Sequence, residues 1–352
     1  KGLDAWIVPQ LEVAIKTGQL PENTLIPTLL SLLLGMIFGV PLTLFGLQPE
    51  HQWAVIEMGM SARGEIARLA EIARPNIGLI TNIGAGHLEN FDGLSGVARA
   101  KGELFISLPA DGIALINVDD EEVRILPVAN SVRRVTFGFN RNADVRADNI
   151  TAHNGSVSFN LVIAGAARRV ILPLPGRHNV ANALAAAAAA MVAGVGMQAI
   201  VAGLESFQPC PGRMELIELP GDVVVLEDSY NANPLSVRAA AEFLATLPGE
   251  SWFVLGDMKE LGEDEQRLHA EVGEALRATG IDRLFATGDL CRAAVDAFGE
   301  GASWYGSVDA LANDVLAQLS DSTNVLVKGS RSMRMERVVD ALRAPAAQRA
   351  EA

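Results

Sequence analysis

The sequence predicts an α/β protein built on mostly parallel sheets with helices on both faces. From residue 39 onward, short apolar runs alternate with segments of helical length and spacing. Repeated strand–helix units of this kind are typical of parallel sheets that are buried on both sides. Between residues 133 and 174 the pattern changes to short alternating runs, which predicts a small antiparallel part. At 352 residues, the chain is long enough for two or three domains.

Strands are predicted where an apolar run of strand length is bounded by turn residues. In chain order they cover 53–58, 77–81, 112–117, 223–226, 252–255, 283–286 and 324–327. Helices are predicted where apolar residues recur three and four positions apart or alanine dominates. They cover 65–73, 94–108, 179–193, 197–206, 234–247, 265–279, 291–298, 308–319 and 335–342. The turn-rich run 208–212 predicts a domain boundary, with one domain at 39–211 and another at 212–345.

The composition argues against some classes of function. A net charge of −14 is unfavourable for a protein that binds nucleic acid through bulk positive charge. Cys210 and Cys291 lie far apart and form no Cys-x-x-Cys pair, so a reducing cytoplasm is the expected location. The run 25–47 carries no charge and has the length of a membrane span, but Pro27 and Pro41 interrupt it. We therefore expect a buried helix and strand there, and no stable membrane insertion.

Two predicted strands each lead to a side chain that can bind a metal ion. Glu57 lies near the end of strand 53–58, and strand 77–81 runs into a glycine-spaced loop that carries His87. Ligands of open α/β sheets bind beyond the carboxyl ends of the strands, and such a pair suits a divalent cation such as Mg²⁺. Turn or capping roles are the alternative for both residues. Lys101, on the next helix, reads by itself as a solvated lysine.

Further polar residues lie at the start of a predicted helix, at the domain boundary and after predicted strands, where ligands commonly bind. Asparagines at the start of helix 179–193 suit a nucleotide, because a helix amino terminus attracts anions, although asparagine is also a common N-cap. An arginine at the domain boundary can reach phosphates. A peptide carboxylate needs a cationic partner, which favours binding over a turn role for the cations after strand 324–327. These candidates are His178, Asn179, Asn182, Arg213, Asp228, Tyr230, Asn231, Asn233, Asp257, Glu260, Lys328, Ser330 and Arg331.

Several motifs, in order along the chain, resemble those of the Mur ligases. The first half carries IEMG, GEIARL and TNIGAGHLENFDGLSGVARAKGELF, which are similar to the central domain of that family. The second half carries PGRHNVANALAA, PGRME, EDSYNANPLSVRAA, LGDMKELG and VKGSRSMRME. The resemblance covers roughly residues 39–342. It implies a Mur-ligase central domain, incomplete at its start, followed by a Rossmann-like α/β domain that completes the ligase.

The resemblance also implies a function. It is that of an ATP- and Mg²⁺-dependent amide ligase of peptidoglycan precursor synthesis, which acts through an acyl phosphate. The run from Asp228 to Pro234 favours the type that adds D-alanyl-D-alanine to UDP-N-acetylmuramoyl-tripeptide. By resemblance, the asparagines of helix 179–193 lie near the adenine, and Asp228 contacts the ribose or a phosphate. Lys101 matches the lysine that becomes carbamylated and supports a magnesium ion, together with Glu57 and His87.

The sequence departs from the family in one respect. No Gly-Lys dipeptide occurs in it, whereas the family's phosphate-binding loop, Gly-x-x-Gly-Lys-Thr/Ser, is expected within residues 1–38. The family's amino-terminal domain, which holds the uridine nucleotide, is not represented either. We expect a truncated or impaired form, and truncation accounts better for the intact motifs downstream. Two alternatives stay open: another Mur-type or folylpolyglutamate-type ligase, and a non-catalytic homologue that has lost ATP hydrolysis.

Overall fold

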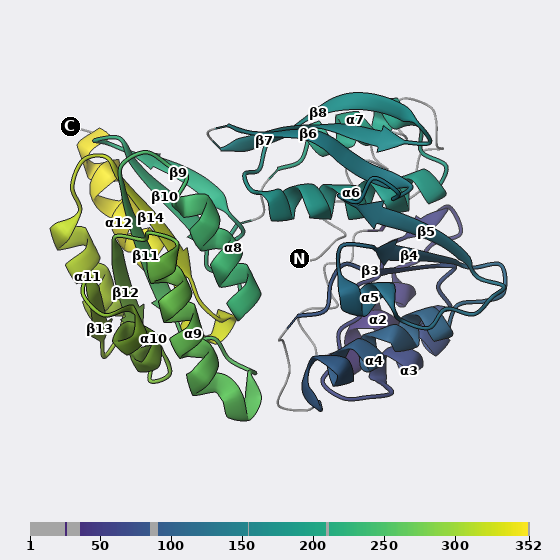
Figure 1. Cartoon of the computed structure of the whole chain (residues 1–352), viewed down its shortest axis with the longest axis horizontal. Coiled ribbons are helices and arrows are strands. Elements are labelled where there is room, and N and C mark those ends of the chain that lie inside the picture. Colours follow the sequence, from purple (N-terminus) through teal and green to yellow (C-terminus); the bar gives the residue numbers. More distant parts are fainter. Residues whose placement is uncertain (1–24, 27–35, 85–90, 154, 209–210, 351–352) are drawn as a thin grey trace. The chain divides into compact units, whose positions relative to one another are not determined.

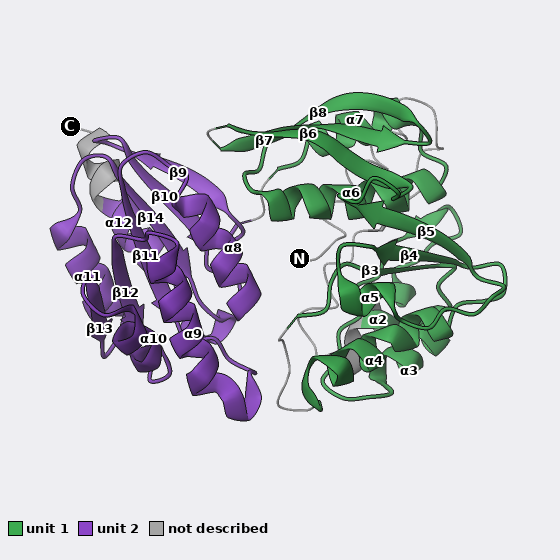
Figure 2. Ribbon diagram, viewed as in Figure 1, with its two compact units in different colours: residues 1–84, 90–208 green, residues 85–89, 209–352 purple. Residues whose placement is uncertain are grey.

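The computed structural model describes residues 25–26, 36–84, 91–153, 155–208 and 211–350. These residues form two compact units, which are coloured separately in Figure 2. The first unit takes the described residues up to Gln208, and the second takes those from Pro211 onward. Each unit has its own hydrophobic core and is described by itself below. The predicted α/β class, with mostly parallel sheets and a small antiparallel part, is confirmed.

The first unit is built on a six-stranded sheet whose strands follow one another in chain order (Figure 1). The first four strands are parallel neighbours, and the last three pair antiparallel. The strands are β3 (Ile77–Ile80), β4 (Ile113–Asn117), β5 (Arg133–Gly138), β6 (Val145–His153), β7 (Ser156–Ile163) and β8 (Ala166–Leu172). The helices are α2 (Met36–Phe45), α3 (Glu65–Ala73), α4 (Gly93–Ile106), α5 (Glu121–Arg124), α6 (Arg177–Val192) and α7 (Met197–Glu205).

Helix α6 packs along the sheet of the first unit (Figure 1). Its residues 183–190 are buried and all but one of them are alanine. Because alanine has a short side chain and a high helix propensity, the helix axis can lie close to the sheet without breaking the helix. The buried side chains of β5 to β8, such as Phe137 and Phe159, fill the space between them.

Three predictions for the first half need correction. Strand 53–58 is reduced to β2 (Trp53–Ala54), which pairs with β1 (Leu25–Ile26) in a separate two-stranded sheet. The strands leading to Glu57 and His87 are therefore not neighbours, because β3 is an edge strand that pairs only with β4 in the described sheet. Strand β5, which we placed in the antiparallel part, pairs parallel with β4 and β6.

The uncharged run 25–47 contains α2, a ten-residue helix that includes Pro41. Residues 27–35 of this run lie outside the described part of the chain. Among the described residues, no helix combines the length and the apolar character that crossing a membrane requires.

The second unit is a six-stranded sheet covered on both faces by helices (Figure 1). Its strands are β9 (Glu215–Leu219), β10 (Val223–Asp228), β11 (Glu250–Gly256), β12 (Arg283–Thr287), β13 (Ala302–Tyr305) and β14 (Thr323–Lys328). Helices α8 (Pro234–Leu244), α9 (Glu265–Ala278) and α10 (Cys291–Phe298) pack on one face, and α11 (Val308–Gln318) and α12 (Glu336–Ala350) on the other. Two short 3₁₀ helices, η2 (Gly262–Asp264) and η3 (Arg331–Met333), complete the unit.

The strand order of the second unit is β13-β12-β11-β14-β10-β9, and all neighbours except β9 and β10 are parallel. The last strand in the sequence, β14, therefore lies between β10 and β11. The carboxyl ends of these three strands are adjacent at one edge of the sheet. Such an edge, where the strand order changes direction, is the usual ligand site of an open α/β sheet. Strands β9 and β13, both at the sheet edges, were not predicted from the sequence.

The prediction of a domain boundary at 208–212 can be tested by limited proteolysis. The two compact units divide after Gln208, and domain boundaries commonly fall in turn-rich segments that proteases reach first. We expect the earliest cleavage within or near 208–212, and a stable fragment that begins at about Met214. Mass spectrometry of the earliest fragments identifies the cut. First cleavage inside 214–340 would show that this boundary is wrong.

Candidate active site

At the carboxyl edge of the first sheet, Lys101 of α4 reaches the loop that follows β3. Its Nζ donates a hydrogen bond to the carbonyl oxygen of Asn82 at 3.1 Å. The same loop is held by two further bonds, from Asn117 Nδ2 to the carbonyl oxygen of Thr81 at 2.7 Å and from the Ile83 N–H to Asp120 Oδ2 at 2.8 Å. Lys101 is thus a half-buried residue of the sheet edge and not a solvated helix lysine.

Burial lowers the pKa of the Lys101 amine, and the nearby carboxylate of Asp120 opposes this shift. Because desolvation disfavours the charged form, a larger fraction of this amine is neutral at a given pH than in a solvated lysine. A neutral amine is a nucleophile, whereas an ammonium group is not. A chemical role of Lys101 stays a prediction.

The rest of the predicted metal cluster is only partly within the described structure. Glu57 is exposed and lies three residues beyond the end of β2. His87 lies outside the described residues, so the cluster of Glu57, His87 and Lys101 stays a prediction. As an ammonium group, Lys101 donates to a carbonyl oxygen and cannot bind a cation. A metal ion would need this group in another chemical form.

Three residues predicted to bind a nucleotide, His178, Asn179 and Asn182, lie at the start of α6. Asn179 is buried, its Nδ2 donates to the carbonyl oxygen of Pro175 at 2.6 Å, and its Oδ1 accepts from Asn182 Nδ2 at 3.4 Å. Gly176 has a φ of +92°, and a Cβ atom there would lie 2.6 Å from Cε1 of His178. The side chain of Asn179 thus shapes the turn before the helix, while His178 and Asn182 are half-buried. Nucleotide binding by these residues stays a prediction.

The central feature of the second unit is a buried ion pair between β10 and β14. Asp228 and Lys328 are register partners at the ends of these parallel strands, and Lys328 Nζ lies 2.5 Å from Asp228 Oδ2. The two side chains are 15% and 4% exposed. Lys328 Nζ also donates to the carbonyl oxygen of Asn231 at 2.9 Å. Lys328 therefore holds the segment that leads into α8, and its charge is already balanced within the protein.

Two arginines lie near the Tyr230 ring in this part of the second unit. The guanidinium carbon of Arg213 is 4.2 Å from the centre of the Tyr230 ring, and that of Arg331 is 6.0 Å from it. The Nε atom of Arg213 is buried and forms no hydrogen bond within the described structure. Three residues after Tyr230, Asn233 is the N-cap of α8 and closes a capping box with Ser236. Its role is therefore explained by helix capping, whereas Arg213 has a donor left for an anion.

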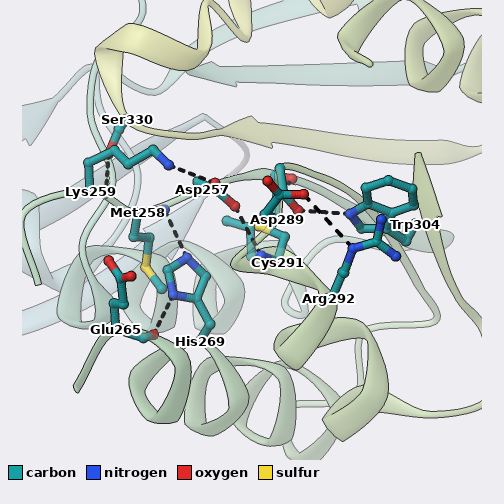
Figure 3. A network of polar contacts seen from close by, with 12 residues as sticks. Asp257, Met258, Lys259, Glu265, His269, Asp289, Cys291, Arg292, Trp304 and Ser330 are labelled. Carbon is teal, nitrogen blue, oxygen red and sulfur yellow. Dashed lines mark hydrogen bonds and ion pairs between the residues drawn. The ribbon is translucent and has the colours of Figure 1, made fainter. Parts of the chain in front are cut away.

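At the end of β11, Asp257 forms a network that we call the Asp257 clasp (Figure 3). Asp257 Oδ2 binds Lys259 Nζ at 2.8 Å, and Oδ1 accepts from the backbone N–H of Cys291, the first residue of α10, at 3.0 Å. The Lys259 N–H donates to Ser330 Oγ at 2.8 Å, and the Ser330 N–H donates to the carbonyl oxygen of Asp257 at 3.1 Å. The Met258 N–H donates to Nε2 of His269 at 2.9 Å.

The clasp ties the ends of β11, β12 and β14 together. Gly288, after β12, shows how tight this packing is, because a Cβ atom there would lie 2.2 Å from Asp257 Oδ1. Ligand atoms of Asp257, His269 and Cys291 lie within 4.8 Å of one another, a spacing that a metal ion can use. Each of the three groups is instead engaged by hydrogen bonds, and burial raises the pKa of the Cys291 thiol well above its usual value. The geometry fits a structural network.

The residues predicted to bind substrate at this edge of the sheet differ in their burial. Asp257, Lys328 and Ser330 are buried, and Glu260 and Arg331 are exposed. Arg331 begins η3 and forms an ion pair with Glu336 at 3.4 Å. The Arg331 guanidinium is exposed despite this ion pair, so an incoming carboxylate could reach it, whereas the buried residues set the shape around it. Substrate binding by this set stays a prediction.

Comparisons with known proteins decide the family. Residues 34–190 match the model of the Mur ligase middle domain, and residues 212–331 match that of the Mur ligase glutamate ligase domain. UDP-N-acetylmuramoyl-tripeptide–D-alanyl-D-alanine ligase of Escherichia coli (strain K12) is 43% identical over 308 residues, which cover 86% of this chain and 68% of that protein. The chain belongs to the Mur ligase family.

Two further comparisons agree with this assignment. A Mur ligase of the same name from Haemophilus influenzae is 36% identical over 310 residues, which cover 87% of this chain and 67% of that protein. The crystal structure of MurF from Acinetobacter baumannii is 32% identical, with a TM-score of 0.86 over 97% of this chain and 74% of that chain. The chain thus spans about two thirds of the length of these curated relatives.

In this Mur ligase, the sequence analysis missed Lys259, His269 and the backbone of Cys291 as members of the clasp. Lys259 stands between Asp257 and Glu260, both of which were singled out. His269 lies on the buried side of α9, next to Leu268 and three residues before Val272. A histidine within an apolar helix stripe is the signal that could have identified it, because a buried imidazole needs hydrogen-bond partners.

Proposed function

We propose that this chain is part of a ligase that joins D-alanyl-D-alanine to UDP-N-acetylmuramoyl-tripeptide. The observation that carries the proposal is the polar edge of the second sheet, where Asp228, Lys328 and the Asp257 clasp meet at adjacent strand ends. The 43% identical Escherichia coli relative bears the name of this activity and supports it. The alternative amide ligases are not favoured, because the relatives at 43% and 36% identity both bear this name.

The described residues would share the work as follows. Arg331 is exposed beside Tyr230 and would hold the carboxylate of the dipeptide by charge-assisted hydrogen bonds. Lys328 would keep Asp228 and the carbonyl oxygen of Asn231 in place, so that Asp228 faces the ribose or phosphates. Arg213, whose buried Nε lacks a partner in the described structure, would contact a phosphate. Held in fixed positions, these groups would orient the attacking amine towards the activated carboxyl group.

The cofactors of this function are ATP and Mg²⁺. ATP supplies the phosphoryl group that activates the carboxylate of the tripeptide, and Mg²⁺ neutralises charge on the phosphates. On the first unit, the carboxylate of Glu57 suits Mg²⁺, but the ammonium form of Lys101 does not. Reaction of the neutral Lys101 amine with CO₂ forms an N–C bond and releases one proton to water. The resulting carbamate would offer oxygen atoms, which suit Mg²⁺ as the carboxylate of Glu57 does.

A chimera tests the proposed function. Residues 39–352 of this chain would be joined to the part of the Escherichia coli relative that lies outside the match. We expect ATP hydrolysis that depends on both the tripeptide nucleotide and D-alanyl-D-alanine. Arg331→Gln in the chimera should raise KM for the dipeptide by about 10-fold or more and leave KM for ATP unchanged, as expected for loss of a charged hydrogen bond.

Arg334→Gln is the matched control for that variant, because Arg334 is an exposed arginine three residues away. It should leave both KM values unchanged. A chimera that accepts single amino acids as readily as the dipeptide would contradict the proposed substrate. Equal effects of the two arginine variants would remove Arg331 from the site.

The role of Lys101 gives a separate prediction. Because burial lowers the pKa of its amine, carbamylation should occur at lower pH than for an exposed lysine. With ¹³C-labelled bicarbonate, we expect a carbamate signal in the NMR spectrum that Mg²⁺ strengthens. Lys101→Arg should abolish the signal, and Lys259→Arg, at a lysine whose side chain is 44% exposed, should keep it. A signal that survives in Lys101→Arg would rule out this residue.

A further inference from the structure

The function proposed above does not use His269, a histidine of α9 with no exposed surface. Its Nε2 lies 2.9 Å from the backbone nitrogen of Met258, and its Nδ1 lies 2.7 Å from the carbonyl oxygen of Glu265, one turn earlier on the helix (Figure 3). The Met258 N–H can only donate, so Nε2 must carry a lone pair. The proton therefore resides on Nδ1 and is donated to Glu265. The two contacts select one neutral tautomer.

The hydrogen bond from Met258 to His269 is connected to Arg331 through the hydrogen bonds of the Asp257 clasp. Met258 lies between Asp257, whose carbonyl oxygen accepts from the Ser330 N–H at 3.1 Å, and Lys259, whose N–H donates to Ser330 Oγ at 2.8 Å. The peptide planes on both sides of Met258 thus hold Ser330. The next residue is Arg331, the exposed cation beside Tyr230.

We propose that His269 is a positioning residue, whose neutral ring orients the Met258 peptide and thereby places Ser330 and Arg331 for the dipeptide substrate. The inference rests on the proposed function only for what these two residues bind. Without an acceptor at Nε2, the buried Met258 N–H has no partner in the clasp. Leaving such a donor unpaired is costly, so the turn rotates to find another partner and releases Ser330.

The same geometry makes the clasp sensitive to acid. Protonation places a second N–H on the ring, directly opposite the Met258 N–H, and two donors cannot form this bond. Burial lowers the pKa of His269 below its usual 6.5, against the carboxylates of Glu265 and Asp257, while the Lys259 ammonium adds to the lowering. The Cys291 thiol, at the start of α10, also lies in this cluster. The bond is complete above pH 6.5 and is lost as the pH falls through the lowered pKa.

Amide hydrogen exchange of Met258, Lys259 and Ser330 in the whole chain tests the proposal between about pH 5 and 8. In the wild type, after correction for intrinsic rates, protection of these three amides should fall as His269 protonates. His269→Gln supplies an acceptor oxygen near the position of Nε2 and cannot titrate, so its protection should not change with pH. His269→Leu fills the space without an acceptor and should lose about 10-fold of protection or more at all pH values.

Val272→Ala is the matched control, because it removes buried volume from the same helix and its side chain forms none of the clasp's hydrogen bonds. It should lower the overall stability and show no selective loss at the three amides. Equal protection in His269→Leu and the wild type would overturn the proposal. The same would follow if His269→Gln kept the pH dependence of the wild type, and this comparison holds even if His269→Leu does not fold.

Titration with D-alanyl-D-alanine, followed at the amide signals of Ser330 and Arg331, links the clasp to the substrate. We expect His269→Leu to weaken binding by about 10-fold and His269→Gln to stay within about 2-fold of the wild type. Unchanged binding in a His269→Leu protein whose clasp has opened would overturn the positioning role. If the wild type shows no response to the dipeptide, the proposed substrate site fails, and the exchange measurements alone decide the role of His269.

Discussion

Replacing Lys328 with methionine is expected to lower the free energy of unfolding of the second unit by about 3–5 kcal/mol. The Lys328 side chain is 4% exposed and that of Asp228 is 15% exposed, so the carboxylate depends on the ammonium group for charge balance. Methionine fills a similar volume but leaves Asp228 and the carbonyl oxygen of Asn231 without their donor. Urea unfolding followed by tryptophan fluorescence, to which Trp252 and Trp304 of this unit contribute, measures the change.

Two control variants separate the ion pair from other effects. Arg337→Met breaks an ion pair with Asp309 whose two side chains are 48% and 68% exposed, and solvent screening should keep its effect to about 1 kcal/mol or less. The double variant Asp228→Asn/Lys328→Met removes both charges and should recover part of the lost stability, because no uncompensated buried charge remains. A loss below about 1 kcal/mol in Lys328→Met would show that the pair is not the support of this edge.

The 352-residue chain, tested as printed, is expected to release phosphate from ATP only at the background rate. Its sequence contains no Gly-Lys dipeptide and hence no loop of the family's phosphate-binding type. Such a loop holds the β- and γ-phosphates through backbone N–H groups and a lysine. Electrostatic groups on a transferring phosphoryl group commonly contribute about 10³-fold or more to the rate. The assay combines the tripeptide nucleotide, D-alanyl-D-alanine, ATP and Mg²⁺.

The chimera described above is the positive control for this assay, because it carries the rest of the Escherichia coli relative. We expect it to turn over under conditions in which the 352-residue chain does not. Turnover by the chain alone at the rate of a complete ligase would contradict the prediction. That outcome would mean that other groups hold the phosphates.

The sequence was sufficient to predict elements whose patterns are local. Helices at 65–73 and 291–298 have the predicted bounds, because their apolar residues recur at helical spacing between turn residues. Strand β9, with the sequence Glu-Leu-Ile-Glu-Leu, was missed because a partly polar edge strand resembles a solvated segment. The strand predicted at 53–58 is shortened to two residues, because an apolar run forms a longer strand only where a partner strand pairs with it.

The sequence by itself determined the α/β class, the Mur-ligase motifs and the polar residues that end the strands. Tertiary structure decided what those polar residues do. Asp228 and Lys328 are 100 residues apart and meet because β14 inserts between β10 and β11. Asp257, predicted to bind substrate, has both carboxylate oxygens engaged within the protein, and His269 completes its network from another helix. Strand order and burial depend on contacts between distant segments, which local sequence patterns do not record.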